Sequence, residues 1–305
     1  MIVDAHLHVW NQIVGMIANE TPVVPLGGGM IRIGEDEMLG MPAYMLDCAA
    51  RAEYVVAEFD AAGVDMGVVV QDYMDGVQND YLREVLDRFP GRFFAHALPN
   101  YWDADHVAEE AARLFEQGFR GLKMPGEHFL GKMRLDDRRF VPIWNAMEEN
   151  GYVLAVDLSE GQDQVQEMEN ILAQCPQLHV ALGHFGMVNR NGWPGQLNLC
   201  RHANVYIETG GIIWLYRNEG YPFSSAIDAI VRAKRDVGIE KLMWGSDWPR
   251  TMIDFTYRQS LDFSRHEDAF SDSEKELLLG ANAARLYQIQ ATTQHRQAVP
   301  VVTEG

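Results

Sequence analysis

The sequence predicts an α/β fold, a single-domain (β/α)8 (TIM) barrel with a long insertion after its first strand. Short apolar runs rich in β-branched residues alternate with longer segments of helical periodicity along most of the 305 residues. Polar residues close both the first and the last of these runs, His6 and His8 in one and Asp247 in the other. A closed parallel barrel places its first and last strands side by side, whereas a doubly wound sheet does not.

The apolar runs predict the strands of this barrel. They cover residues 2–8, 66–72, 93–98, 119–124, 152–158, 179–185, 205–210 and 241–247. A helical stripe lies between two of them, with apolar side chains at i, i+3, i+4 and i+7, namely Phe140, Ile143, Trp144 and Met147. Ser271 and Glu274 have the spacing of a capping box and predict the start of a last helix that runs through Leu286.

Two segments interrupt the alternation. Residues 11–42 contain Pro22, Pro25 and three consecutive glycines, 27–29, and are expected to form a long loop on the active face. Such a loop either packs on the surface or helps to wall a pocket. Residues 291–305 lack periodicity, so we expect a loose C-terminal tail after a barrel domain of residues 1–290.

The charge and cysteine content exclude several classes of partner. Lys and Arg total 25 against 44 Asp and Glu, a formal net charge of -19, which disfavours nucleic acid and anionic membrane. Cys48, Cys175 and Cys200 have no CxxC spacing and predict buried free thiols. Without a signal-peptide pattern or a membrane-spanning apolar run, we expect a cytoplasmic protein with a small-molecule substrate. The oligomeric state, a homo-oligomer included, stays open.

The carboxyl ends of barrel strands meet at one mouth, so the polar residues at these ends are the candidate site. They are His6, His8, Lys123, Asp157, His184, Glu208 and Asp247. In an extended strand, His6 and His8 point to the same side. Imidazole and carboxylate ligands suit zinc or manganese, and an open coordination position holds and acidifies a water. Asp247 can ligate the metal and take the proton of that water, while His184 can polarise a carbonyl or shuttle a proton.

The remaining strand-end residues each have two readings. Lys123 can hold a substrate carboxylate or phosphate, or pair with a nearby acid. Asp157 is either a metal ligand or a cap for the next helix, which we expect to start near residues 159–160. Arg250, directly after the last strand, is a candidate anion clamp for substrate. For Glu208, a solvated or helix-capping carboxylate is the better interpretation.

Six segments of the chain carry a resemblance to a known family. They are Val3-Asp4-Ala5-His6-Leu7-His8, Gly121-Leu122-Lys123, Leu182-Gly183-His184-Phe185-Gly186, Asn204-Val205-Tyr206-Ile207-Glu208-Thr209, Trp244-Gly245-Ser246-Asp247-Trp248-Pro249 and Asn282-Ala283-Ala284-Arg285-Leu286. Across nearly the whole chain, this pattern resembles the amidohydrolase-2 branch of the amidohydrolase superfamily, which includes aminocarboxymuconate-semialdehyde decarboxylase and several lactonases. The resemblance implies a distorted barrel, His6, His8 and Asp247 as metal ligands, and His184 as the catalytic histidine.

The fifth strand departs from that family. Its decarboxylases carry a histidine ligand there, whereas this chain has Asp157. Asp157 either replaces the imidazole as a ligand or leaves a site that binds metal weakly or not at all. Some lactonases of this branch work without metal, so the resemblance does not by itself imply the ion.

We therefore predict a metal-dependent hydrolase of a small carboxylate or lactone, with water activated at one divalent ion, zinc first and manganese second. A metal-free variant stays open. The expected metal ligands are His6, His8, Asp157 and Asp247, the catalytic residues Asp247 and His184, and the substrate-binding residues Lys123 and Arg250. The alternatives are a non-oxidative decarboxylase (carboxy-lyase) that uses the same site, and an inactive barrel that acts as a binding protein.

Overall fold

The computed structural model describes residues 1–290, so the predicted tail at residues 291–305 lies outside the described residues. In the described part, parallel strands form a 3-stranded sheet of order β1-β6-β7 and a 5-stranded sheet of order β12-β11-β10-β9-β8. Their bounds are β1 (Val3–Leu7), β6 (Met66–Val69), β7 (Phe93–Ala95), β8 (Gly121–Pro125), β9 (Val153–Asp157), β10 (His179–Leu182), β11 (Val205–Glu208) and β12 (Leu242–Met243). Each lies within, or within one residue of, a predicted strand.

Two parallel bridges join these sheets into a closed barrel. Leu7 pairs with Trp248 across the β1–β12 seam, and Ala97 pairs with Leu122 across the β7–β8 seam. At the first seam, the Ala5 N–H donates to the Trp244 carbonyl at 2.9 Å. The predicted fold class is therefore confirmed, and the first and last strands are neighbours. The central strands are buried on both faces, which explains their nearly continuous apolar sequence.

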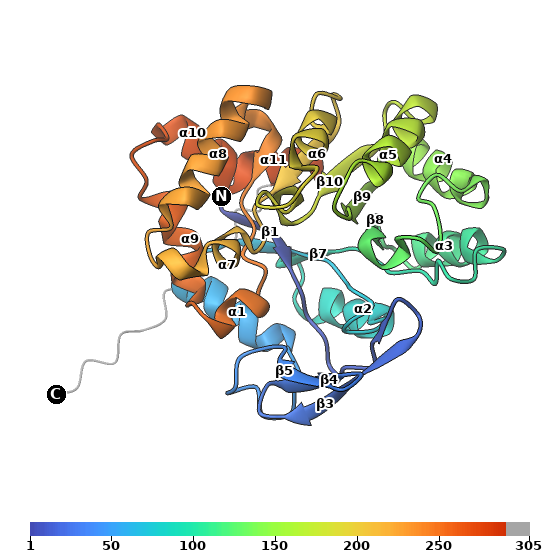
Figure 1. Cartoon of the computed structure of the whole chain (residues 1–305), viewed down its shortest axis with the longest axis horizontal. Helices are drawn as coiled ribbons and strands as arrows, with labels where there is room; N and C mark the ends of the chain where they lie inside the picture. The colour runs from blue at the N-terminus through green and yellow to red at the C-terminus, as the bar shows by residue number, and fades with distance from the viewer. Residues whose placement is uncertain (291–305) are drawn as a thin grey trace.

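Helices surround the strands (Figure 1). They are α1 (Ala52–Ala62), α2 (Asn79–Arg88), α3 (Val107–Glu116), α4 (Val141–Asn150), α5 (Asp163–Gln174), α6 (Trp193–Leu199), α7 (Ile212–Leu215), α8 (Ser224–Val237), α9 (Tyr257–Arg265), α10 (Asp272–Glu276) and α11 (Asn282–Leu286). The predicted stripe buries Ile143, Trp144 and Met147 on α4. The capping box of Ser271 and Glu274 is present at α10, but the predicted last helix contains a π-helical turn, Leu277–Ala281, between α10 and α11. Among the described residues, no helix is long and apolar enough to cross a membrane.

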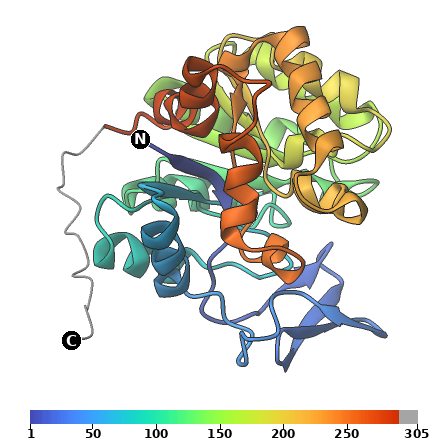
Figure 2. The ribbon, with the colours of Figure 1, turned by 90° about the vertical axis from the view of Figure 1, so that its left-hand side faces the viewer.

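The insertion after β1 is a small antiparallel sheet rather than the loop expected from its sequence. Its strands are β2 (Met16–Ile17), β3 (Thr21–Gly27), β4 (Met30–Ile33) and β5 (Asp36–Leu39), in that order across the sheet. It lies at one end of the barrel, beyond the carboxyl end of β1 (Figures 1 and 2). The glycines that suggested a loop make the β3–β4 hairpin turn. Gly29 suits this turn because its φ is +75° and a Cβ there would lie 2.5 Å from the Met41 carbonyl oxygen.

The three cysteines of the chain are free and buried, as expected from their spacing.

Candidate active site

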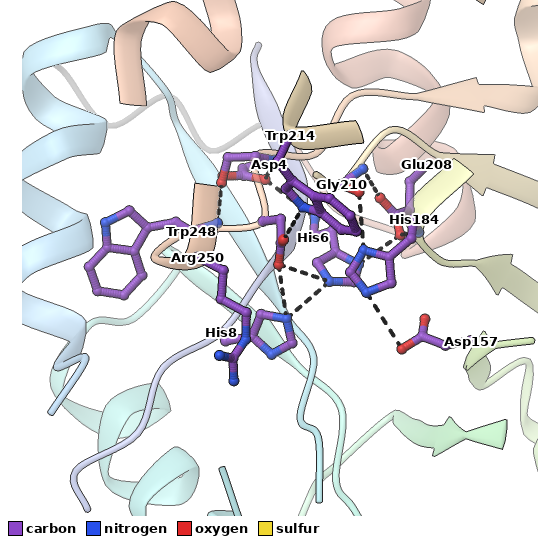
Figure 3. Close-up of polar contacts among 12 residues, drawn as sticks. Asp4, His6, His8, Asp157, His184, Glu208, Gly210, Trp214, Trp248 and Arg250 are labelled. Carbon is purple, nitrogen blue, oxygen red and sulfur yellow. Dashed lines mark hydrogen bonds and ion pairs between the residues drawn. The ribbon is translucent and has the colours of Figure 1, made fainter. Parts of the chain in front are cut away.

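The end of β1 and the segment after β12 bring three candidate ligand atoms together (Figure 3). His6 Nε2 lies 3.1 Å from His8 Nε2, and Asp247 Oδ1 lies 3.2 Å from His8 Nε2 and 3.7 Å from His6 Nε2. Two atoms that ligate one zinc tetrahedrally at about 2.0–2.1 Å stand about 3.3–3.4 Å apart. Asp247 Oδ1 is buried without a hydrogen-bond partner among the described residues. This donor set therefore fits a divalent ion.

Backbone contacts across the β1–β12 seam place Asp247. Its N–H donates to the His6 carbonyl at 2.9 Å, and its φ is +54°, a left-handed conformation that Asp tolerates better than most residues. Asp4, buried on β1, accepts hydrogen bonds from the Ser246 N–H and the Tyr257 hydroxyl, each at 2.8 Å. The carboxylate that approaches the two histidines is thus held by the strand that carries them.

The electrostatics of the site favour the ligand forms of these side chains. Burial, with the charges of His184 and His8, lowers the pKa of His6, so its imidazole is neutral at pH 7. Burial alone would raise the pKa of Asp247, but the close contact with His8 and the charge of His184 hold it well below its usual range. A neutral imidazole and an ionised carboxylate are the forms that bind a metal.

Trp214, at α7, determines which oxygen of Asp247 stays open. Its indole N–H donates to Asp247 Oδ2 at 2.8 Å, which leaves Oδ1 toward the histidines. Gly211, directly before α7, leaves room for this indole, because a Cβ there would lie 1.9 Å from the indole nitrogen.

His184 lies beside these donors at the end of β10. Its Nδ1 is 3.1 Å from the Gly210 carbonyl oxygen, to which it donates, and its Nε2 is 3.8 Å from Asp157 Oδ2. One ligand atom each of His6, His184 and Asp247 lies within 4.8 Å of the others. Burial lowers the pKa of His184, but the charges of Asp157, Asp247 and Glu208 outweigh it, so the pKa is raised overall. His184 is therefore suited to donate a proton near neutral pH.

Lys123 and Asp157 form a buried ion pair on the opposite side of the mouth. Lys123 Nζ lies 2.6 Å from Asp157 Oδ2, and the lysine side chain is 0% exposed. Burial alone would raise the pKa of Asp157, but the Lys123 charge brings it below its usual value. Helix α5 begins at Asp163 after Gln162, so the capping interpretation of Asp157 is wrong. Of the two readings of Lys123, this contact matches the pairing with an acid.

Arg250 contacts the insertion and the loop after β6. Its guanidinium donates to Asp75 and, at 2.9 Å, to the Gly40 carbonyl, and it lies over the Trp10 ring. On the other side, His128 Nδ1 accepts the Ala18 N–H at 3.1 Å. These are two of the contacts that attach the insertion to the barrel; backbone bonds from Val14 to Asp75 and from Met16 to Tyr73 are others.

Glu208 is the site residue that the sequence interpretation undervalued. It is 1% exposed, and its Oε1 lies 2.7 Å from His6 Nδ1, so the expectation of a solvated or capping carboxylate is wrong. The signal was its position at the end of a strand buried throughout, where a carboxylate needs polar partners.

Comparisons with known proteins give the family and the fold. The amidohydrolase family matches residues 3–289. A 4-sulfomuconolactone hydrolase from Rhizobium radiobacter is 21% identical over 205 residues, which are 65% of this chain and 66% of that protein. A second, from Hydrogenophaga intermedia, is 22% identical over 199 residues, 63% of this chain and 62% of that protein. The chain thus matches less than two thirds of the length of either relative.

Solved structures share the fold along most of the chain. An amidohydrolase from Burkholderia multivorans with bound zinc has a TM-score of 0.69 at 19% identity, over 95% of this chain and 100% of its own. A probable 2-pyrone-4,6-dicarboxylic acid hydrolase from Acinetobacter baumannii has a TM-score of 0.68 at 19% identity, over 94% of this chain and 99% of its own. A 2,6-dihydroxybenzoate decarboxylase from Rhizobium has a TM-score of 0.59 at 17% identity, over 80% and 89%. With a family match that spans almost all of the described residues, the chain belongs to the amidohydrolase family.

Proposed function

We propose that this protein hydrolyses a lactone, with a divalent metal ion, zinc first, held by His6, His8 and Asp247. The observation that carries the proposal is the convergence of two imidazole nitrogens and one unpartnered carboxylate oxygen at ligand spacing. The names of the two relatives, both lactone hydrolases, support the reaction class. Asp157, paired with Lys123, is not needed as a ligand in this assignment.

The two catalytic residues take complementary parts in lactone opening. A divalent ion bound here supplies Lewis acidity toward a carbonyl oxygen and toward water. Asp247, ionised, accepts the proton of the attacking water. His184, protonated because of its raised pKa, donates a hydrogen bond to the carbonyl oxygen and keeps its proton. The water oxygen bonds to the carbonyl carbon, the ring carbon–oxygen bond breaks, and Asp247 returns its proton to the leaving alkoxide. The product is a hydroxy acid.

Lys123 and Arg250 were expected to bind substrate, and their contacts suggest a less direct part. Both cations are already paired with a carboxylate, Lys123 with Asp157 and Arg250 with Asp75. We propose that the Lys123–Asp157 pair sets the charge that His184 experiences, and that Arg250 holds the insertion over the mouth. Substrate recognition then depends on the insertion and on the loop after β10.

Non-oxidative decarboxylation is the second candidate. A proton on His184, close to the metal donors, can also be delivered to a carbon atom that loses carbon dioxide. The intact donor set argues against the third reading, an inactive binding protein.

Metal analysis followed by an activity panel tests the proposal. Protein purified without chelator is expected to contain about one divalent ion per chain and to release protons from lactones in an indicator assay. The panel contains each lactone with and without a carboxylate substituent, because Lys123 and Arg250 are already paired with carboxylates of the protein. It also contains aromatic carboxylates, for which carbon dioxide release is measured. Carbon dioxide release without lactone hydrolysis would select the decarboxylase. If metal-loaded protein shows neither lactone hydrolysis nor carbon dioxide release, both candidate functions are contradicted.

A further inference from the structure

We propose that Glu208 is a positioning residue that fixes the tautomer of His6, so that the Nε2 lone pair faces the other donors, and that holds His184 with the same carboxylate. This inference rests on the metal site proposed above. It concerns a residue of β11 that contacts Nδ1 of His6, the ring nitrogen that is not turned toward the other donors.

The contacts of Glu208 leave it almost no freedom. Its Oε1 lies 2.7 Å from His6 Nδ1 and accepts the His184 N–H at 2.9 Å, while its Oε2 accepts the Gly210 N–H. Two glycines also wall the carboxylate, because a Cβ on Gly210 would lie 2.6 Å from Oε2 and one on Gly245 would lie 3.0 Å from it. The chain thus has small residues where a side chain would displace this group.

The direction of the hydrogen bonds sets the tautomer. Burial raises the pKa of Glu208 to about 7, but both of its oxygens accept backbone N–H groups, from His184 and Gly210, and these bonds favour the ionised carboxylate, which only accepts. His6 Nδ1 must therefore carry the proton in its contact with Oε1, since an unprotonated Nδ1 would place a lone pair against the carboxylate. In the neutral ring, Nε2 is then unprotonated. That nitrogen is the one that lies 3.1 Å from His8 Nε2.

One carboxylate oxygen links two parts of the site. Oε1 contacts both the His6 ring on β1 and the His184 backbone at the end of β10. Removing the charge of Glu208 is therefore expected to disturb metal affinity and the placement of His184 together. A carboxylate that only stabilised the barrel would change neither in the folded protein.

Zinc affinity of the metal-free protein, measured by competition with a chromophoric chelator, tests the proposal without an activity assay. Glu208→Gln is expected to weaken zinc binding about 10- to 100-fold, as loss of a partner that orients a ligating histidine does. The matched control is Glu167→Gln, because Glu167 is also buried and accepts a backbone N–H, from Leu135 at 2.8 Å, but contacts no imidazole. The control is expected to stay within about threefold of the wild type.

A nitrogen NMR spectrum of histidine-labelled, metal-free protein reads the tautomer directly. The wild type is expected to show His6 with Nδ1 protonated and Nε2 free, and Glu208→Gln to show a mixture or the opposite tautomer. If Glu208→Gln fails to fold, Glu208→Asp keeps the charge, shortens the side chain by one methylene, and is expected to weaken zinc binding in the same direction.

Three results would overturn the proposal: unchanged zinc affinity in folded Glu208 variants, a loss no larger than that of Glu167→Gln, or an unchanged His6 tautomer. A wild type that binds no zinc would instead contradict the proposed metal site. The NMR result would still decide the role of Glu208 in that case.

Discussion

The charged and polar groups on the two sides of the barrel mouth make different contacts. On the β1–β12 side, each of His6 and Asp247 has one polar atom bound to a neighbour and another left open toward a common point. On the β8–β9 side, Lys123 and Asp157 are bound to each other. The first arrangement keeps donor atoms available to a ligand that is not part of the chain. The second pairs two opposite charges within the chain, although Asp157 Oδ1 has no hydrogen-bond partner among the described residues.

Asp247→Asn is expected to have the largest effect, because it removes the open donor atom and the proposed proton acceptor in one change. We expect turnover to fall by roughly four orders of magnitude, the upper range for loss of a general base, with weaker metal binding. Steady-state kinetics and metal analysis measure the two effects. A variant with normal turnover would show that the open donors are not the reacting side of the mouth.

His184→Asn distinguishes a proton donor from a ligand at the boundary of the two sides. Turnover is expected to fall by roughly two to four orders of magnitude while metal content and fold persist. Metal content per chain is the deciding measurement. If the His184→Asn variant contains no bound ion, His184 is a ligand instead.

Asp157→Asn tests the β8–β9 side of the mouth, where Asp157 is paired with Lys123. The change leaves Lys123 charged and buried, so the free energy of unfolding is expected to fall by about 3–5 kcal/mol, with zinc affinity unchanged. The double variant Lys123→Met with Asp157→Leu is expected to recover most of that loss. Denaturant unfolding and chelator competition measure both quantities. A sharp drop in zinc affinity would restore Asp157 to the coordination shell.

A smaller effect is expected from His96, which packs on the β8 side. Burial, with the Lys123 charge, lowers the pKa of His96 to about 3, from 6.5. Between these values the unfolded chain binds a proton that the folded chain does not. His96 therefore makes the free energy of unfolding fall as pH drops below about 6.5, by about 1.4 kcal/mol per pH unit. His96→Phe should flatten that part of the profile, measured by urea unfolding from pH 7 to 5. An unchanged slope would contradict the assignment.

The sequence was sufficient for the barrel because its strands are buried on both faces and leave uninterrupted apolar runs. It was also sufficient to predict that His6, His8 and Asp247 lie together, since the ends of parallel strands meet at one mouth. It failed at the insertion, where prolines and glycines indicated a loop although the prolines lie in β3, an inner strand of a small sheet, and the glycines form its turn. It failed at Glu208 because the partner of a buried carboxylate is 202 residues away in the chain.

Two of the contacts that anchor the insertion bear on how its sequence can vary. Arg250 donates to the Gly40 carbonyl and His128 accepts the Ala18 N–H, so both anchors hold backbone groups of the insertion. A segment with other side chains that keeps the same backbone path therefore keeps both anchors. The side chains of residues 11–42 can diverge while residues 128 and 250 stay unchanged, and a library that varies residues 11–42 alone would sample walls that remain attached to the barrel.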